Sequence, residues 1–305
     1  MVFPVGVTLP VDHVELPHEF MTMEAVREMA QAVEAAAFHA ASVTDHPIPG
    51  TRWLDNGGHY AQDPFVLLSL IAAVTTRLRV QTNILVLPYR NPFLTARAVS
   101  SLDVFSGGRV SLGVGAGYLK AEYKALGVSL ERRNDLMGEY VAAMKLAWTG
   151  EDFAFEGSGY SAPGNRMLPV PIQKPHPPLL VGGNSHMAIR HAAEFGDAWN
   201  PFFAPPSMSK AARTTSFSGE DDLDAGLTYL RDHCDRIGRD SPPDLHLSGL
   251  ATIASDYNPQ EIVDRIGAYR ARGVQSVSIM ISTNQRSAWC QLAQDFGDRV
   301  IAKLD

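Results

Sequence analysis

The sequence predicts an α/β fold, a (β/α)8 TIM barrel that takes up residues 1–305 as one domain. Apolar strand-like runs alternate with helix-like runs along the whole chain of 305 residues, in eight strand–helix units. Such alternation is typical of parallel strands joined by right-handed helical crossovers, and eight units favour a closed barrel. An open doubly wound sheet with extra strands is the alternative. With 45% hydrophobic and 19% charged residues, the chain has the composition of a globular protein with a large core.

The expected strands are short apolar runs, and the expected helices carry apolar residues every three or four positions. The strands are residues 5–9, 40–44, 79–87, 110–114, 179–181, 198–200, 246–253 and 276–281. The helices are residues 23–38, 64–75, 92–105, 132–148, 184–195 and 223–237, with two more beginning near 259 and 287. Asn258 and Pro259 have the pattern of a helix N-cap and first residue, and Gly196 that of a residue after a helix end. A small hairpin is expected around residues 156–159.

Charge and cysteine content exclude several classes of function. The net charge of −7 argues against general binding to nucleic acid or to an anionic membrane surface. The two cysteines, Cys234 and Cys290, are too few for a disulfide framework or a four-thiolate metal site. The histidines show no metal-binding spacing, so no metal is expected. No targeting segment or membrane span is visible, and we expect a cytoplasmic protein.

Asp45 and His46 directly follow the second expected strand. Side chains in this position of a barrel reach the active-site face, where a histidine can act as a general acid or base. The alternative is an Asx turn with a histidine that faces solvent.

Two glycine runs end strands. Gly113, Gly115 and Gly117 alternate in the sequence, which permits close approach of a flat ligand or phosphate. This run lacks the dinucleotide fingerprint, and no helix pattern opens directly after it, so a bend in a barrel strand is the alternative. Gly182 and Gly183 lead into the fifth helix, whose free N–H groups would make the best phosphate site in the chain. A tight turn capped by Asn184 is the alternative there.

Asn83 and Ile84 lie inside the third expected strand. A polar Asn is unusual in a parallel strand, because such strands are generally apolar. It indicates either a bulge beside the pocket or an ordinary inward-facing polar side chain.

Taken together, these motifs resemble the bacterial luciferase-like family of flavin- or deazaflavin-dependent oxidoreductases. The resemblance is carried by VTDHPIP at 43–49, the block 77–128 that contains QTNILVLPYRNP and SLGVGAGYLKAEY, and the block 171–200 that contains PLLVGGNSH. It covers about residues 3–200 and is looser beyond.

The resemblance implies a flavin-type ring at the C-terminal mouth of the barrel. Within the family the chain looks most like the coenzyme F420 branch, with FMN as the alternative cofactor. The resemblance implies that His46 is catalytic and that Asn83–Ile84 is a non-proline cis peptide behind the ring. The residues expected to contact the cofactor are Asp45, Asn83, Ile84, Gly115, Ala116, Gly117, Gly182, Gly183, Asn184 and Ser185, the last four at its phosphate.

The chain also departs from part of that family. Members that oxidise sugar phosphates carry an acidic proton acceptor after strand 4, and the matching position here looks like Ala116. This leaves His46 as the obvious proton-transfer group, with Glu122 interpreted as a helix-start charge. The acidic tail of F420 would favour basic residues at the mouth, and the candidates are Arg52, Lys120, Arg166 and Lys210.

The sequence therefore predicts an F420-dependent oxidoreductase that transfers a hydride between the deazaflavin C5 and a small organic substrate, with His46 as proton donor or acceptor. An FMN-dependent, two-component monooxygenase that uses reduced flavin is the first alternative, and a non-catalytic flavin or deazaflavin carrier is the second. The loops 47–63 and 203–222 would build the substrate pocket. The family resemblance also predicts a homodimer that pairs through the helices after strands 2 and 3.

Overall fold

A computed structural model describes residues 2–206, 209 and 214–304 of the chain. Its main sheet contains eight parallel strand positions around a ring, and the first and last strands pair, Val5 with Val277 and Thr8 with Met280. In order around the ring, the strands are β1 (Val5–Thr8), β2 (Ala40–Val43), β3 (Arg79–Val86), β4 (Val110–Gly115), β7 (Leu179–Gly182), β8 (Ala198–Asn200), β9 (Asp244–Leu247) and β11 (Ser276–Ile281). This closure confirms the predicted barrel and excludes the open sheet.

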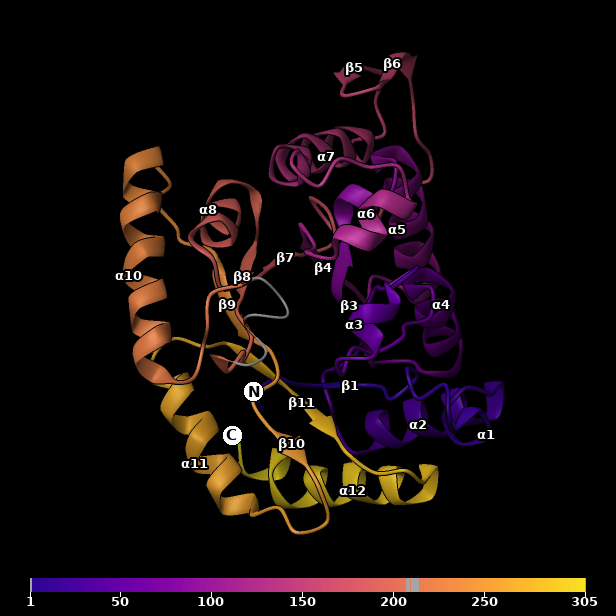
Figure 1. Ribbon diagram of the computed structural model, residues 1–305, viewed down its shortest axis with the longest axis vertical. Coiled ribbons are helices and arrows are strands. Elements are labelled where there is room, and N and C mark those ends of the chain that lie inside the picture. The colour runs from indigo at the N-terminus through magenta and orange to yellow at the C-terminus, as the bar shows by residue number, and fades with distance from the viewer. Residues whose placement is uncertain (1, 207–208, 210–213, 305) are drawn as a thin grey trace.

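A helix follows each barrel strand and covers the outside of the ring (Figure 1). These helices are α2 (Met23–Ala35), α4 (Pro64–Val74), α5 (Pro92–Ser106), α7 (Arg133–Ala147), α8 (His186–Phe195), α10 (Glu220–Ile237), α11 (Pro259–Arg270) and α12 (Arg286–Arg299). The shorter elements are α1 (Pro17–Phe20), α3 (Thr51–Leu54), α6 (Lys120–Ala125), the 3-10 turns η1 (Leu87–Tyr89) and η2 (Ile301–Lys303), and the strand β10 (Thr252–Ile253). The expected hairpin is present as β5 (Phe153–Gly157) and β6 (Tyr160–Asn165), which stand beyond α7.

Local sequence signals fix several helix starts. Asn258 caps α11 by accepting from the backbone N–H groups of Gln260 and Glu261, with Pro259 at the first position, as predicted. Asn91 caps α5 in the same way, and Pro92 follows it. In each case the cap satisfies N–H groups that have no partner inside the helix.

Two details differ from the sequence prediction. The seventh strand was expected to run through residues 246–253, but it is divided into β9 and β10, with Gly249 at a φ of +69° between them. Gly196 does end α8, although its φ is −80° rather than left-handed. A Cβ at Gly196 would lie 2.9 Å from a Val181 methyl and 3.0 Å from the Ala192 carbonyl oxygen, so close packing requires glycine there.

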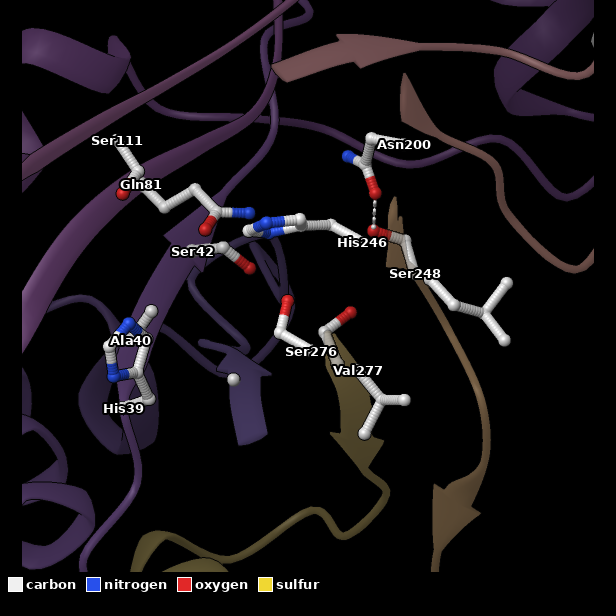
Figure 2. Close-up of a pocket in the computed structure, with 13 residues that line it drawn as sticks. His39, Ala40, Ser42, Gln81, Ser111, Asn200, His246, Ser248, Ser276 and Val277 are labelled. Atoms are coloured by element: carbon white, nitrogen blue, oxygen red, sulfur yellow. Dashed lines mark hydrogen bonds between the residues drawn. The ribbon is translucent and has the colours of Figure 1, made fainter. Parts of the chain in front are cut away.

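Along the barrel strands, apolar residues alternate with small or polar ones. The apolar residues pack under the helices, and the small or polar residues face the lumen. The lumen holds a cavity of about 30 Å³, which Figure 2 shows with side chains of Ser42, Gln81, His246 and Ser276 around it. A second cavity of about 230 Å³ is lined by first residues of strands, among them Arg79, Ala198 and Asp244, and therefore lies at the N-terminal end of the barrel. The second cavity is therefore remote from the candidate site, whereas the lumen cavity reaches Asn200 and Ser248 at the C-terminal ends of β8 and β9.

Candidate active site

His46 lies at the C-terminal end of β2, three residues beyond Val43, and its side chain is 10% exposed. Its Nδ1 atom is 3.3 Å from Oε2 of Glu122. The imidazole is therefore held inside the mouth of the barrel, which excludes the alternative of a histidine that faces solvent.

Glu122 was interpreted as a helix-start charge, and the structure corrects that interpretation. It does lie in the first turn of α6, but its side chain is completely buried. Besides His46, it accepts from the Tyr89 hydroxyl at 2.9 Å and from the Ile48 N–H at 3.3 Å. A helix-start charge would be solvated, whereas this carboxylate has three polar neighbours, two from the loop after β2 and one from η1 after β3.

The prediction that no helix opens after the glycine run is wrong as well. α6 begins at Lys120, three residues after Gly117. The six-residue helix is too short to show an apolar period, which is why the pattern did not reveal it. Its position carries Glu122 back over the strand ends toward His46.

Three aromatic rings surround the His46 imidazole. The ring centroids of Trp53 and His59 are 4.7 and 4.9 Å from it, and that of Tyr118 is 6.2 Å away. Trp53 lies directly against the predicted catalytic histidine. One side of the mouth is therefore formed by aromatic rings, and next to it lies the hydrogen-bonded pair of His46 and Glu122, called the dyad below.

Charge and burial shift the titration of these groups. Burial and then the Glu122 carboxylate raise the pKa of the Tyr118 hydroxyl to about 12. Burial and Glu122 also raise the pKa of Tyr89 far above its usual range. Burial lowers the pKa of His59, and the neighbouring His46 lowers it further. At neutral pH the two phenols are consequently donors that keep their protons.

Asp45 is buried and is fully engaged by neighbouring residues. Arg90 donates to both carboxylate oxygens, at 2.6 and 2.8 Å, and the Val86 N–H donates at 2.9 Å. This fork is the strong, planar form of an ion pair. Asp45 therefore ties the end of β2 to the end of β3, and a contact between its side chain and a cofactor stays a prediction.

The expected bulge in β3 is present, because the pairing with β4 shifts register between Thr82 and Leu85. The Asn83–Ile84 peptide is cis. Asn83 Oδ1 accepts from Asn200 Nδ2 at 3.2 Å, and the Ser248 hydroxyl donates to Asn200 Oδ1 at 2.8 Å; Figure 2 shows the second of these bonds. The Asn83 side chain is thus held across the lumen by the strands opposite.

The bulge directs Ile84 toward the strand ends of β4 and β7. A Cβ at Gly115 would lie 2.2 Å from Ile84 Cδ1, and a Cβ at Gly182 would lie 2.6 Å from Ile84 Cγ2. The two glycines therefore leave space that the isoleucine fills. The half-buried Ile84 side chain presents an apolar platform in the mouth, which fits the flat face of a flavin-type ring.

The other residues of the first glycine run are placed by α6 and β3. The Ala116 carbonyl oxygen accepts from the Tyr123 hydroxyl. Gly117 has a φ of +66°, and a Cβ there would lie 2.5 Å from a Val86 methyl. The run therefore makes the tight turn from β4 into α6 at the rim of the mouth.

The second glycine run leads into α8, and Ser185 rather than Asn184 is the N-cap. Ser185 Oγ accepts from the Ala188 N–H at 3.2 Å, so its hydroxyl proton is available to a ligand. Asn184 instead accepts from the Phe202 N–H at 3.0 Å and donates to two carbonyl oxygens of the loop after β8. Gly183 has a φ of +131°, which favours glycine. The turn thus presents backbone and a serine hydroxyl at a helix N-terminus.

The four basic residues expected near the mouth divide into three groups. Arg52 in α3 and Lys120 at the start of α6 are exposed, and the two helices meet where Gly50 approaches Ala121. Arg166 pairs with Asp152 at 2.8 Å beside the hairpin beyond α7, so it does not lie at the mouth. Lys210 lies outside the described residues, as do residues 207–208 and 211–213 of the loop 203–222.

Within the described part of the chain, no three His, Cys, Asp or Glu side chains gather as a metal site would require. The same residues contain no helix with the length and hydropathy of a membrane span.

Sequence reasoning missed Glu122, His59 and Tyr118 as members of the site. Only proximity in the fold links them to His46, since they come from the loop after β2 and the segment after β4. The one signal in the sequence was position, because each follows a barrel strand.

Comparisons with known proteins show the family of the chain. Residues 3–218 match the family model described as luciferase-like monooxygenase. An uncharacterized protein of Mycobacterium tuberculosis is 31% identical over 241 residues, which are 75% of this chain and 77% of that protein. The FMNH2-dependent dimethylsulfone monooxygenase of Pseudomonas putida is 30% identical over 175 residues, 56% of this chain and 46% of that protein. The F420-dependent hydroxymycolic acid dehydrogenase of M. tuberculosis is 29% identical over 189 residues, 61% and 51% of the two chains.

Solved structures show the same fold. Monooxygenase RslO1 from Streptomyces bottropensis superposes with a TM-score of 0.78 at 20% identity, over 98% of this chain and 99% of that chain. An F420-dependent secondary alcohol dehydrogenase in complex with an F420-acetone adduct superposes with a TM-score of 0.77 at 17% identity, over the full length of both chains.

Proposed function

The chain belongs to the luciferase-like monooxygenase family, and we propose that it is a coenzyme F420-dependent oxidoreductase that acts on a small organic substrate. The observation that carries the proposal is a protected proton-transfer group, His46, held 3.3 Å from a buried carboxylate at the same barrel mouth as the Ile84 platform. Hydride chemistry on a carbon–oxygen or similar bond needs one such group for the accompanying proton.

The residues of the mouth fit a flavin-type cofactor. Ile84, Asn83 and the turn Gly115–Ala116–Gly117 would lie against the ring, and the turn from Gly182 to Ser185 would hold the phosphate. A helix N-terminus with free N–H groups and a serine hydroxyl favours an anion. Arg52 and Lys120 would face an acidic tail, because both are exposed on helices at this rim.

When bound, the deazaflavin supplies a hydride acceptor or donor at C5. His46 would give or take the substrate proton, and Trp53, His59 and Tyr118 would exclude water from it. The chain's contribution is therefore to orient the two partners and to hold the proton.

An FMN-dependent monooxygenase that receives reduced flavin from a partner is the second candidate. It is favoured by the 30% identity to the dimethylsulfone monooxygenase, whose name specifies FMNH2. The hydroxymycolic acid dehydrogenase, whose name specifies F420, is 29% identical over a slightly longer segment. The two cofactors share a flat tricyclic ring and a phosphate, so the platform and the α8 turn suit either.

Parallel titration of the cofactor-free protein with F420 and with FMN, followed by ligand fluorescence, separates the candidates. We expect F420 to bind with a micromolar or lower dissociation constant and FMN much more weakly. The reverse preference would replace our proposal with the monooxygenase, which would then consume oxygen in the presence of substrate and a flavin reductase. Tight F420 binding without turnover on any of a broad panel of alcohols, aldehydes and ketones would instead favour the carrier.

Two further expectations belong to the proposal. A homodimer is supported by the exposed apolar side chains of Val66 on α4 and of Leu94 and Phe105 on α5. A cytoplasmic location stays a prediction from composition.

A further inference from the structure

Glu122 has the burial and the contacts of a residue that controls His46. We propose that Glu122 is a positioning residue, which accepts the Nδ1–H of His46 and thereby makes Nε2 the atom that exchanges a proton with the substrate. The inference deepens the proposed function and rests on its assignment of His46 as the proton-transfer group.

The first step of the argument is the direction of the hydrogen bond. A carboxylate has no proton to give, so the ring nitrogen 3.3 Å from Glu122 Oε2 must carry one. That nitrogen is Nδ1, which leaves Nε2 unprotonated in the neutral ring. Nε2 is therefore the base in one direction of the reaction and, once protonated, the acid in the other.

The second step is how firmly Glu122 itself is held. The Tyr89 hydroxyl donates to Oε2 at 2.9 Å, and the Ile48 N–H donates to Oε1 at 3.3 Å. Because burial and Glu122 raise the pKa of Tyr89 far above neutrality, this donor does not ionise. Each oxygen thus has a fixed partner besides His46, and the carboxylate can neither rotate away nor reach water.

The third step is the charge balance inside the mouth. Two buried carboxylates, Asp45 and Glu122, lie near one permanent cation, Arg90, and Arg90 makes its fork with Asp45. Among the residues that the structure describes, no Lys or Arg side chain hydrogen-bonds to Glu122. A proton taken up by His46 places an imidazolium against this carboxylate, which compensates the buried charge.

The fourth step is how the chain brings Glu122 there. The turn at Gly117 reverses the chain after β4, and α6 packs so closely on α3 that a Cβ at Gly50 would lie 2.8 Å from the Ala121 methyl. The Tyr123 hydroxyl also donates to the Ala116 carbonyl oxygen. These contacts fix the short helix on the rim, which is what a positioning residue requires.

The tautomer of His46 can be read directly by ¹⁵N NMR of cofactor-free protein labelled at histidine, with His46 assigned by its loss in His46→Ala. In the wild type we expect Nδ1 protonated and Nε2 free in the neutral ring. In Glu122→Gln we expect this preference to be lost, because the amide can either accept from or donate to Nδ1. Tyr89→Phe and the distant control Glu139→Gln, whose carboxylate bonds Ser158 on the hairpin, should keep the wild-type tautomer.

Turnover with F420 and an identified substrate supplies the second measurement. We expect Glu122→Gln to lower kcat by at least about tenfold with little change in KM, by analogy with the loss when a buried carboxylate no longer orients a catalytic histidine. The pH–rate profile of Glu122→Gln should also shift relative to that of the wild type. The other titratable or charged groups in the mouth are Asp45, His59, Tyr89, Arg90 and Tyr118. Glu139→Gln should leave both unchanged.

Each outcome decides one of the two proposals. Nε2–H as the dominant tautomer of the wild type would overturn the positioning role, and this reading needs no folded Glu122 variant. Turnover in Glu122→Gln within about threefold of the wild type, with the tautomer altered, would overturn it too. An active His46→Ala enzyme would instead exclude His46 as the proton-transfer group of the proposed function. The tautomer measured in the wild type would be unaffected by that result.

Discussion

At the scale of single residues, His46 is the group on which the proposed chemistry depends most. Its imidazole is 10% exposed and has Glu122 on one side and three aromatic rings around it. None of the cofactor-holding features described above uses its side chain. Binding of the cofactor and proton transfer should therefore separate when it is replaced.

His46→Ala should reduce kcat by about 10²- to 10⁴-fold, the usual contribution of a general acid or base. The affinity for F420, measured by fluorescence titration, should change much less. His18→Ala on α1 is a matched control, because His18 is exposed and lies on the N-terminal short helix away from the dyad. Turnover of His46→Ala within about threefold of the wild type would exclude the acid–base role.

His246 gives a prediction on stability against pH. It faces the lumen (Figure 2), where burial lowers its pKa to about 4, with Arg79 and His39 lowering it and Asp244 opposing them. The unfolded chain takes up this proton first as the pH falls through about 6.5, so the folded state loses stability between about pH 6.5 and 4. Above pH 6.5 the contribution is complete.

Urea unfolding at pH 7.5 and pH 5 checks this expectation. For His246 alone the loss should be about 2 kcal/mol, from the difference between the two pKa values. His246→Gln removes the titrating group, so the variant should lose about that much less than the wild type over the same interval. Equal losses in the two proteins would mean that other groups, such as the buried His191, account for the acid sensitivity.

At the scale of elements, α11 shows how a two-residue signal fixes a helix start. Asn258 Oδ1 accepts from the backbone N–H of Gln260 at 3.1 Å, and Pro259 occupies the position whose N–H would have no partner. The helix packs Ile262, Ile266 and Tyr269 into the core. Capping therefore contributes to the stability of the last third of the barrel.

Asn258→Ala should lower the free energy of unfolding by about 1 kcal/mol, the usual cost of losing an N-cap side chain. Asn258→Asp, which keeps an acceptor at the same place, should lie within a few tenths of a kcal/mol of the wild type. Denaturant unfolding of the three proteins measures the differences. An alanine variant as stable as the aspartate variant would show that the cap is replaced by water.

At the scale of the whole molecule, α4 and α5 carry an apolar outer face. Phe105 is 87% exposed, Leu94 72% and Val66 64%, on two helices that pack side by side. Large exposed aromatic side chains are uncommon on monomers and are typical of interfaces. These are the helices after strands 2 and 3 through which the predicted homodimer would pair, and the dimer stays a prediction.

Phe105→Glu should convert the predicted dimer to a monomer in light scattering coupled to size-exclusion chromatography, because a buried unpaired charge at an interface is strongly unfavourable. Its circular dichroism should match the wild type. Ile237→Glu, at an exposed apolar residue at the end of α10, should stay dimeric. A monomeric wild type would refute the dimer itself.

The sequence by itself determined the barrel and the family. The hydrophobic periodicity predicts the strands and helices of the ring, because each of them must bury one apolar face. Their order along the chain then sets their order around the barrel. The VTDHPIP, NILV and LLVGGNS motifs identified the family, and residues 3–218 confirm it. The N-cap at Asn258 was also visible in advance, because local residue types decide it. The residues alone left the bulge at Asn83–Ile84 as one of two alternatives, and the family resemblance implied the cis peptide there.

Tertiary structure alone decided which side chains meet at the mouth. Glu122 and His46 are 76 residues apart, and no local pattern tells a buried helix-start carboxylate from a solvated one. Ser185 rather than Asn184 caps α8 because the Asn184 side chain is bound by the loop after β8. Arg166 is drawn to Asp152 and away from the mouth. In each case the outcome depends on distances between segments far apart in sequence, which the closure of the barrel sets.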